Sequence, residues 1–262
     1  MRTKTKAPIV YLALITAINY LPILVVVAFS FNASKLPTTW TSFSLRWYGK
    51  LASNTRILES LRNSLIMGLS STLLSAIIGT LGALGLAKTD YKTNKLVSFL
   101  ATLPLMIPEI ILGMVYLAYF SLFSIPFGFP TLLLAHTSFC VPYIMMMVSA
   151  RLVGMDENLE EAARDLGASR ARAFRDITLP LLSPAILSGS ILAFAMSFDD
   201  IVISVFVNSP YFNTLPTRIY TQMKTGVTPE INALCTLMLL VTLSGILLSF
   251  AIIHKKRKQS PS

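Results

Sequence analysis

The sequence predicts an all-α integral membrane protein with six transmembrane helices in one domain over residues 1–262. Hydrophobic residues make up 54% of the chain and charged residues only 13%, and the mean hydropathy is +0.67. These values lie far outside those of soluble globular domains. The apolar residues gather in stretches of the roughly 20 residues that a helix needs to cross the hydrocarbon core. These stretches cover about residues 8–31, 60–87, 96–123, 131–153, 184–207 and 231–253.

The first stretch begins like a secretory signal, with basic residues before an apolar run. We interpret it as a retained helix, because the run is longer than a signal core and lacks a convincing cleavage site at its end. The connection that follows holds Trp40 and Trp47, which suit a membrane interface, and Ser44 precedes a predicted short surface helix. The second stretch carries small residues at helical spacing, which favour close helix packing in lipid.

Three acids stand out in the third and fifth stretches. Glu109 lies about 13 residues from the cytoplasmic start of its helix, a depth of roughly 20 Å, and Asp199 and Asp200 lie about as deep. An ionisable group at that depth costs several kcal/mol unless it is paired or wetted. No Lys or Arg falls in the middle of any stretch. We therefore predict that Glu109, Asp199 and Asp200 belong to a pathway for a cationic substrate.

Two alternatives for these acids stay open. One or more can be protonated or paired with a partner subunit, since desolvation favours the neutral carboxyl group. Adjacent residues on a helix point about 100° apart, so Asp199 and Asp200 are not both expected to face the pathway, and the sequence does not say which does. His136, in the fourth stretch, is expected to be a hydrogen-bonded helix residue rather than a proton relay.

The basic residues predict the orientation. Fifteen lie on one side of the predicted membrane: Arg2, Lys4, Lys6, Lys88, Lys92, Lys95, Arg151, Arg164, Arg170, Arg172, Arg175, Lys255, Lys256, Arg257 and Lys258. The other side has seven: Lys35, Arg46, Lys50, Arg56, Arg62, Arg218 and Lys224. Because basic loops stay in the cytoplasm, both termini and the loop 154–183 are expected inside. The net charge of +10 is therefore explained by topology and not by nucleic-acid binding.

The cytoplasmic loop 154–183 contains the pattern EAA-x3-G-x9-I-x-LP, formed by Glu161, Ala162, Ala163, Gly167, Ile177, Leu179 and Pro180. Acids crowd the first turn of a predicted helix from Asp156 to Leu166, and Gly167 stands where a glycine ends a helix. Leu159, Ala162, Ala163 and Leu166 share one side. A solvated connector is the alternative, but so many fixed spacings favour a docking helix.

This pattern resembles the coupling loop of permease subunits of binding-protein-dependent ABC importers. The similarity extends to the C-type permeases of spermidine/putrescine importers, in stretches that include Ser138 to Pro142, Ser197 to Asp200 and Lys224 to Ala233. The family usually has Asp after Ser-Pro in the third helix, and this chain has Glu109 after Ile107-Pro108. The charge is kept, while the reach of the carboxylate differs.

The resemblance implies a type I ABC importer permease fold in the inner, cytoplasmic membrane. It also implies a second homologous permease subunit, two ATPase subunits that bind ATP and Mg²⁺, and a periplasmic or extracellular polyamine-binding protein. Membrane lipid surrounds the chain, and no nucleic acid is expected. The substrate implied is spermidine or putrescine, and the sequence does not distinguish them.

The sequence argues against catalysis by the chain itself. No Gly-x4-Gly-Lys-Ser/Thr loop is present to hold phosphates, and no catalytic or metal-ligating cluster appears. Cys140 and Cys235 lie inside helices and are expected to pack there. The alternatives are an ABC importer permease for another cation or small solute and, in a different class, a proton-coupled secondary transporter. The latter would explain the acids but leave the loop without a purpose.

Overall fold

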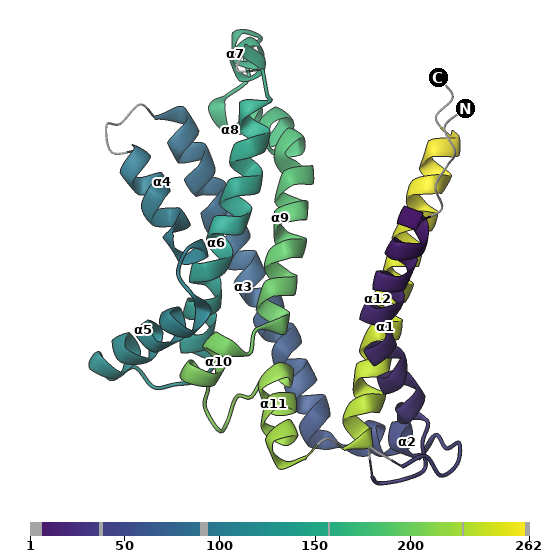
Figure 1. Ribbon diagram of the computed structural model, residues 1–262. Helices are drawn as coiled ribbons and strands as arrows, with labels where there is room; N and C mark the ends of the chain where they lie inside the picture. Colours follow the sequence, from purple (N-terminus) through teal and green to yellow (C-terminus); the bar gives the residue numbers. More distant parts are fainter. Residues whose placement is uncertain (1–6, 37–38, 90–93, 157, 227, 260–262) are drawn as a thin grey trace. The chain divides into compact units, whose positions relative to one another are not determined.

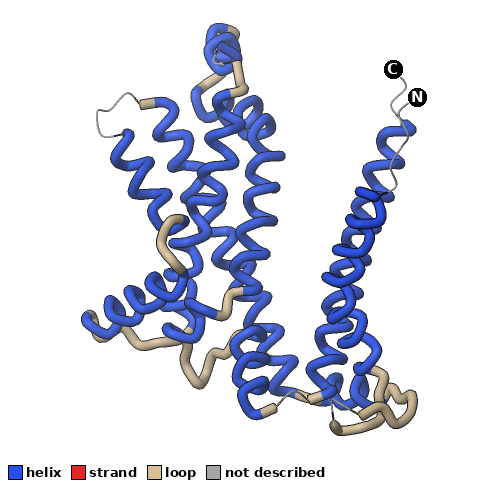
Figure 2. Tube along the Cα trace, viewed as in Figure 1, coloured by secondary structure: helices blue, strands red, loops and turns tan. Residues whose placement is uncertain are grey.

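The computed structural model describes residues 7–36, 39–89, 94–156, 158–226 and 228–259. Over these residues the chain is helical, with no strand and only two isolated bridges, Asn32 with Phe43 and Ser209 with Phe212 (Figure 2). The all-helical fold class predicted from composition is confirmed. Arg2, Lys4, Lys6 and Lys92, which contributed to the orientation argument, lie outside the described residues.

The helices are named here in chain order, as labelled in Figure 1. They are α1 (Ala7–Ser30), α2 (Arg46–Ser53), α3 (Thr55–Lys88), α4 (Asn94–Thr102), η1 (Leu103–Leu105), α5 (Glu109–Leu122), α6 (Phe129–Val153), α7 (Asn158–Asp165), α8 (Arg170–Ala173), η2 (Phe174–Thr178), α9 (Leu179–Asp199), α10 (Val202–Val207), α11 (Leu215–Thr225) and α12 (Pro229–Gln259).

Two of the predicted stretches are broken helices. In 96–123, α4 and η1 are bent by 104° relative to α5. Pro104 lies in η1 and Pro108 precedes α5, and a proline both removes a backbone donor and disfavours the helical conformation of the residue before it. In 184–207, α9 ends at Asp199 and α10 begins at Val202, because Asp200 has an extended backbone with ψ of 124°.

The described residues contain four helices that are long and apolar enough to cross a membrane, or five when the bent α4–α5 pair counts as one span. The apolar part of α12 whose side chains are described, Pro229–Ser244, is shorter than a full span, although the helix backbone continues to Gln259. The total of six spans remains a prediction.

The chain divides into two compact units, one formed by Met1–Leu58 with Thr221–Ser262 and the other by Glu59–Tyr220. In the first unit, α1 and α2 pack against α12. Trp47 is only 4% exposed, and its indole N–H donates to the Asn32 carbonyl over 2.7 Å. It is therefore a core residue of this unit and not the interfacial anchor that the sequence predicted, whereas Trp40 is 50% exposed.

In the second unit, α6 packs along α9, and α5 packs along α10. Glycines permit the close approach around Ile144 of α6, which is fully buried. A Cβ on Gly79 of α3 would lie 3.0 Å from the Val141 carbonyl oxygen, and one on Gly189 of α9 would lie 3.1 Å from the Ile144 Cα. In lipid, where hydrophobicity does not drive helices together, such close packing is what holds them.

Candidate functional site

The first half of the loop motif forms α7 and its C-terminal turn. The Asp156 carboxylate accepts from the Asn158 backbone N–H over 3.0 Å at the start of the helix. At the other end Gly167 has φ of +89°, and the amides of Gly167 and Ala168 donate to the carbonyls of Arg164 and Ala163. This is the glycine-ended turn expected from the sequence, and it reverses the chain directly after the Glu161-Ala162-Ala163 triplet.

The second half of the motif lies at the junction of η2 and α9. Ile177 belongs to the single π-helical turn, and Leu179 and Pro180 are the first two residues of α9. Thr178 before α9 is itself helical, so Pro180 lies within one continuous helix, Arg170–Asp199, directly after its π-helical turn, and its missing N–H leaves out one backbone hydrogen bond there. The spacing of the motif therefore connects a short exposed helix to the start of a long apolar one.

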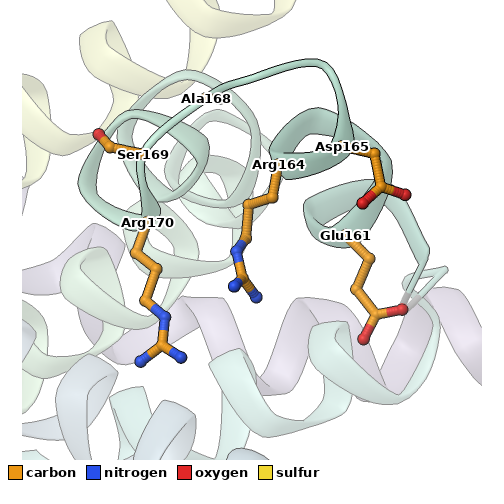
Figure 3. A pocket seen from close by; sticks show the side chains of 6 residues that line it. All are labelled: Glu161, Arg164, Asp165, Ala168, Ser169 and Arg170. Carbon is orange, nitrogen blue, oxygen red and sulfur yellow. The ribbon is translucent and has the colours of Figure 1, made fainter.

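A hollow of about 520 Å³ lies beside α7 and the turn that follows it. Its charged lining residues are Glu161, Arg164, Asp165 and Arg170, and Figure 3 shows the side chains of Glu161, Arg164 and Arg170 extending to the same side. Leu166 beside it is 91% exposed. The described part of the loop thus presents an apolar side chain and both signs of charge together, as a surface that docks on a protein would.

Glu160, which is outside the motif, connects α7 to two other elements. Its carboxylate forms an ion pair with Lys88 at the end of α3, and its Oε2 accepts from the Thr178 hydroxyl of η2 over 3.3 Å. The Lys88 ammonium, which both donates to the carboxylate and attracts its charge, holds the pKa of Glu160 below its ordinary value of 4.5. The sequence alone does not point to this contact, because Lys88 and Glu160 lie 72 residues apart.

We expect Lys88→Gln to loosen α7. A partly exposed ion pair contributes little to stability, so amide hydrogen exchange in Asn158–Asp165 should quicken by about two- to fivefold. Because Glu160 has a lowered pKa, the pair stabilises above pH 4.5, and the difference between variant and parent should be lost only as the pH falls through that lowered value. Hydrogen exchange with mass spectrometry measures both effects.

Asp176→Asn is the matched control for Lys88→Gln. Asp176 pairs over 2.8 Å with its neighbour Arg175, and both side chains are well exposed. Both residues of that pair lie in η2, so the pair does not connect two helices. Its loss should leave amide hydrogen exchange in α7 unchanged. Equal exchange in the Lys88→Gln variant and the parent would contradict the anchoring role of Lys88.

A second cavity, of about 400 Å³, lies where the two helix breaks meet. The break before α5 contributes Pro104, Leu105 and Glu109, and the break after α9 contributes Asp199 and the residues up to Ile203. Helix breaks at membrane depth are tolerated where they line a cavity, and in transporters they commonly form the substrate site. All three acids predicted from the sequence line this one cavity.

Glu109 and Asp199 are exposed side chains at opposite kinds of helix end. Glu109 is the first residue of α5, where the helix dipole favours a carboxylate. Asp199 is the last residue of α9, where the free carbonyls add to its negative charge. Within the described residues neither carboxylate has a hydrogen-bond or ion-pair partner. Both are therefore available to a cation in the cavity.

Asp200 differs from its neighbour, because its side chain is only 6% exposed and its oxygens are occupied. One oxygen accepts from the Ile203 backbone N–H over 3.2 Å. The other accepts from the N–H and the hydroxyl of Ser204, over 2.8 and 2.7 Å, and lies 3.4 Å from His136 Nε2. Asp200 thus caps the first turn of α10 while it contacts α6.

The His136 ring, fully buried, continues this network to two more helices. Its Nε2 lies 3.1 Å from Ser204 Oγ and its Nδ1 lies 2.8 Å from Ser197 Oγ of α9. Ser197 is in turn 2.8 Å from Ser71 Oγ of α3. His136 is hydrogen-bonded, as expected from the sequence. Its partners were not predicted, because they lie on other helices and only the packing of those helices brings them together.

The aromatic residues of the cavity are Phe139 and Tyr143 of α6. The sequence analysis did not identify them. Four residues apart, they share a face of α6, and this spacing is the signal that points to them. Tyr143 is partly exposed, so its ring is accessible from the cavity.

The sequence model of the family described as "Binding-protein-dependent transport system inner membrane component" matches residues 73–258. Among curated proteins, the spermidine/putrescine transport system permease protein PotC of Escherichia coli K12 is 37% identical over 95% of this chain and 94% of its own length. The putrescine transport system permease protein PotI of the same strain is 40% identical over 84% of this chain and 81% of its own length.

Among solved structures, this fold is similar to a chain in the crystal structure of a bacterial ABC transporter involved in the import of the acidic polysaccharide alginate. The TM-score is 0.71 at 13% identity, covering 97% of this chain and 98% of the other. At this identity the similarity shows a shared fold and nothing about the cargo of this chain.

Proposed function

The chain belongs to the family of binding-protein-dependent transport system inner membrane components, and on this basis we propose that it is the permease subunit of an ATP-driven polyamine importer. It is a multi-pass protein of the inner membrane. The single observation that favours a cationic cargo is the cavity at the two helix breaks, in which Glu109 and Asp199 have no competing partner among the described residues.

A polyamine fits this cavity by charge and by shape. Two free carboxylates can each bind one ammonium group, and the C-terminal carbonyls of α9 add a negative potential beside Asp199. The partly exposed ring of Tyr143 adds cation–π attraction. A volume of about 400 Å³ is in the range of small-molecule sites, so an extended diamine or triamine is accommodated.

ATP acts through partners in this proposal. A second homologous permease completes the pathway, and two ATPase subunits bind ATP and Mg²⁺. An external binding protein, periplasmic or extracellular, delivers the polyamine. The surface of α7 with Glu161, Leu166 and Arg170 docks on an ATPase subunit, so that closure of the ATPases moves α7 and, through Lys88 and Thr178, the ends of α3 and α9.

Reconstitution of the whole assembly in proteoliposomes tests the function. We expect uptake of radiolabelled putrescine or spermidine that needs ATP and the binding protein and that persists when an uncoupler removes the proton gradient. Competing cations should inhibit it and a neutral sugar should not. Uptake driven by a proton gradient without ATP would favour the secondary transporter instead. ATP-dependent uptake of another solute in preference to polyamines would keep the fold and overturn the cargo.

The orientation leads to a labelling prediction. Cys140 and Cys235 are first replaced, and single cysteines are then introduced at Leu166 and Ala52, which are both exposed. Ala52 is preferred to Asn54, whose side-chain amide donates to Glu230 over 2.5 Å. In intact cells that lack the ATPase subunits, an impermeant thiol reagent should label A52C only, and permeabilised cells should show both. The reverse pattern would overturn the orientation and with it the docking role of α7.

A further inference from the structure

The hydroxyl of Ser204 determines which atom is the hydrogen-bond donor in its contact with His136. It has one proton, which it donates to Asp200 Oδ2 over 2.7 Å. It can therefore only accept in its 3.1 Å contact with His136 Nε2, so this ring nitrogen is the donor. The Nε2–H lies between Ser204 Oγ and Asp200 Oδ2, which is 3.4 Å away. The geometry assigns the tautomer that directs an N–H at the Asp200 carboxylate.

The other side of the ring is satisfied whether or not Nδ1 is protonated. With neutral His136, Ser71 donates to Ser197 and Ser197 donates to Nδ1. With an imidazolium, both hydroxyls reverse, and Ser71 donates to the Gly68 carbonyl 3.2 Å away. In both arrangements the two hydroxyls and both ring nitrogens keep a partner, and Nε2–H still points to Asp200. The contact between His136 and Asp200 is thus maintained in either state.

We propose that the neighbouring aspartates have separate roles: Asp199 binds the cargo, and Asp200 with His136 forms a positioning pair that fixes the α9–α10 break. This division rests on the proposed function, since a cargo cation defines the role of Asp199. Asp200 has no free oxygen for the cargo. The hydrogen bonds of Asp200 hold Ile201 and the first turn of α10 against α6. Because α10 is held there, α9 ends at Asp199 and the Asp199 carboxylate lies in the cavity.

The positioning pair explains how a charged Asp200 is stabilised inside the membrane without contact to the cargo. A buried carboxylate is strongly destabilising when one partner is removed, because the remaining charge has neither water nor donors. Four donors satisfy it here: the side chains of Ser204 and His136, and two backbone N–H groups of α10. His136 acts through Asp200, so it is a positioning residue for the cavity that it does not line.

Conservative rescue distinguishes the two aspartates. The full chain in detergent is unfolded by heat, and ATP-driven polyamine uptake is measured in the reconstituted assembly. Asp199→Asn should leave the apparent midpoint unchanged and lower uptake by about tenfold or more, and Asp199→Glu should restore uptake to within about threefold. Asp200→Asn and Asp200→Glu should both lower the midpoint, on the order of 5 °C, because the longer Glu does not fit four fixed contacts.

The role of His136 is tested with two substitutions, each of which places an amide group where one of the two ring nitrogens lies. The side-chain amide of Gln reaches the place of Nε2 and that of Asn the place of Nδ1. His136→Gln should therefore keep a higher midpoint and more uptake than His136→Asn. Asp200→Asn should cause little further loss in the His136→Asn background, as expected of coupled residues. Cys140→Ser, a buried change on the same helix that retains a donor to the Ala193 carbonyl, is the matched control and should shift neither quantity.

The outcomes separate this proposal from the proposed function. Absence of polyamine uptake by the unmodified assembly would remove the function, whereas the midpoints would still report the positioning pair. Recovery of uptake by Asp200→Glu with an unchanged midpoint would instead make Asp200 a cargo carboxylate and overturn the division. Strict additivity of His136→Asn with Asp200→Asn would overturn the pairing. His136→Gln falling to the level of His136→Asn would overturn the assigned donor.

Discussion

A chain with Gly167→Pro is expected to insert normally into the membrane and to import nothing. Gly167 has φ of +89°, and proline is fixed near −65°, so the turn after α7 cannot form. The change removes the reversal that presents Glu161 and Leu166, while no atom outside the adjacent residues lies within 4 Å of the Gly167 Cβ position. The defect is therefore confined to the docking surface. Co-purification of the ATPase subunits and polyamine uptake should both fall to background.

Gly226→Ala is the matched control for backbone strain. Gly226 also has a positive φ, +119°, with nothing within 4 Å of its Cβ position, but it lies in the other compact unit. An Ala there also strains the backbone, by about 1–3 kcal/mol, and should leave ATPase binding intact. Glu161→Lys, which adds a third cation beside Arg164 and Arg170, should abolish coupling without any backbone strain. Normal uptake in both loop variants would refute the docking role.

Neutralising both free carboxylates of the cavity is expected to cause the second large loss. In Glu109→Gln/Asp199→Asn, each change removes about 1.5–3 kcal/mol of charge-assisted interaction with the cargo. Each loss corresponds to about a ten- to hundredfold lower rate, so the double variant should import polyamine at the limit of detection. Uptake is measured at saturating loaded binding protein. ATP hydrolysis stimulated by the binding protein should remain, because the acids lie outside the loop that we propose docks on the ATPases.

Glu59→Gln is the control for the loss of one negative charge. Glu59 is exposed on α3 and does not line the cavity, so its neutralisation should leave uptake within about twofold of the parent, as is usual for exposed polar changes. Unchanged uptake and unchanged preference for cations in the double variant would rule out the carboxylate pathway. Glu109 and Asp199 would then be assigned to packing or to the second permease subunit.

The similarity to the alginate importer shows how little the fold says about cargo charge. That transporter is involved in the import of an acidic polysaccharide, and one of its chains shares this architecture at 13% identity. A shared fold therefore does not fix the charge of the cargo, which depends on particular side chains. In this chain those side chains are carboxylates, which is the physical reason for expecting a cation.

The sequence by itself determined the helical membrane class, the family resemblance and the local form of the loop. Long apolar stretches can satisfy their backbone in lipid only as helices, so composition was sufficient for the class. Gly167 and the acids at the start of α7 specify a short helix with a glycine-ended turn through contacts a few residues apart. Glu109 and the two aspartates stood out because charge is rare at that depth.

Only the tertiary structure decided what each of these acids contacts. Asp199 and Asp200 are adjacent, and helix geometry could say only that they point in different directions. The partners that separate them come from elsewhere in the chain: His136 is 61 residues from Ser197 and 68 from Ser204. The α9–α10 break is likewise stabilised by contacts across helices, and no proline in the sequence there indicates it. Hydrogen bonds between distant segments leave no local periodicity, and for that reason the cavity and its buried network required the folded chain.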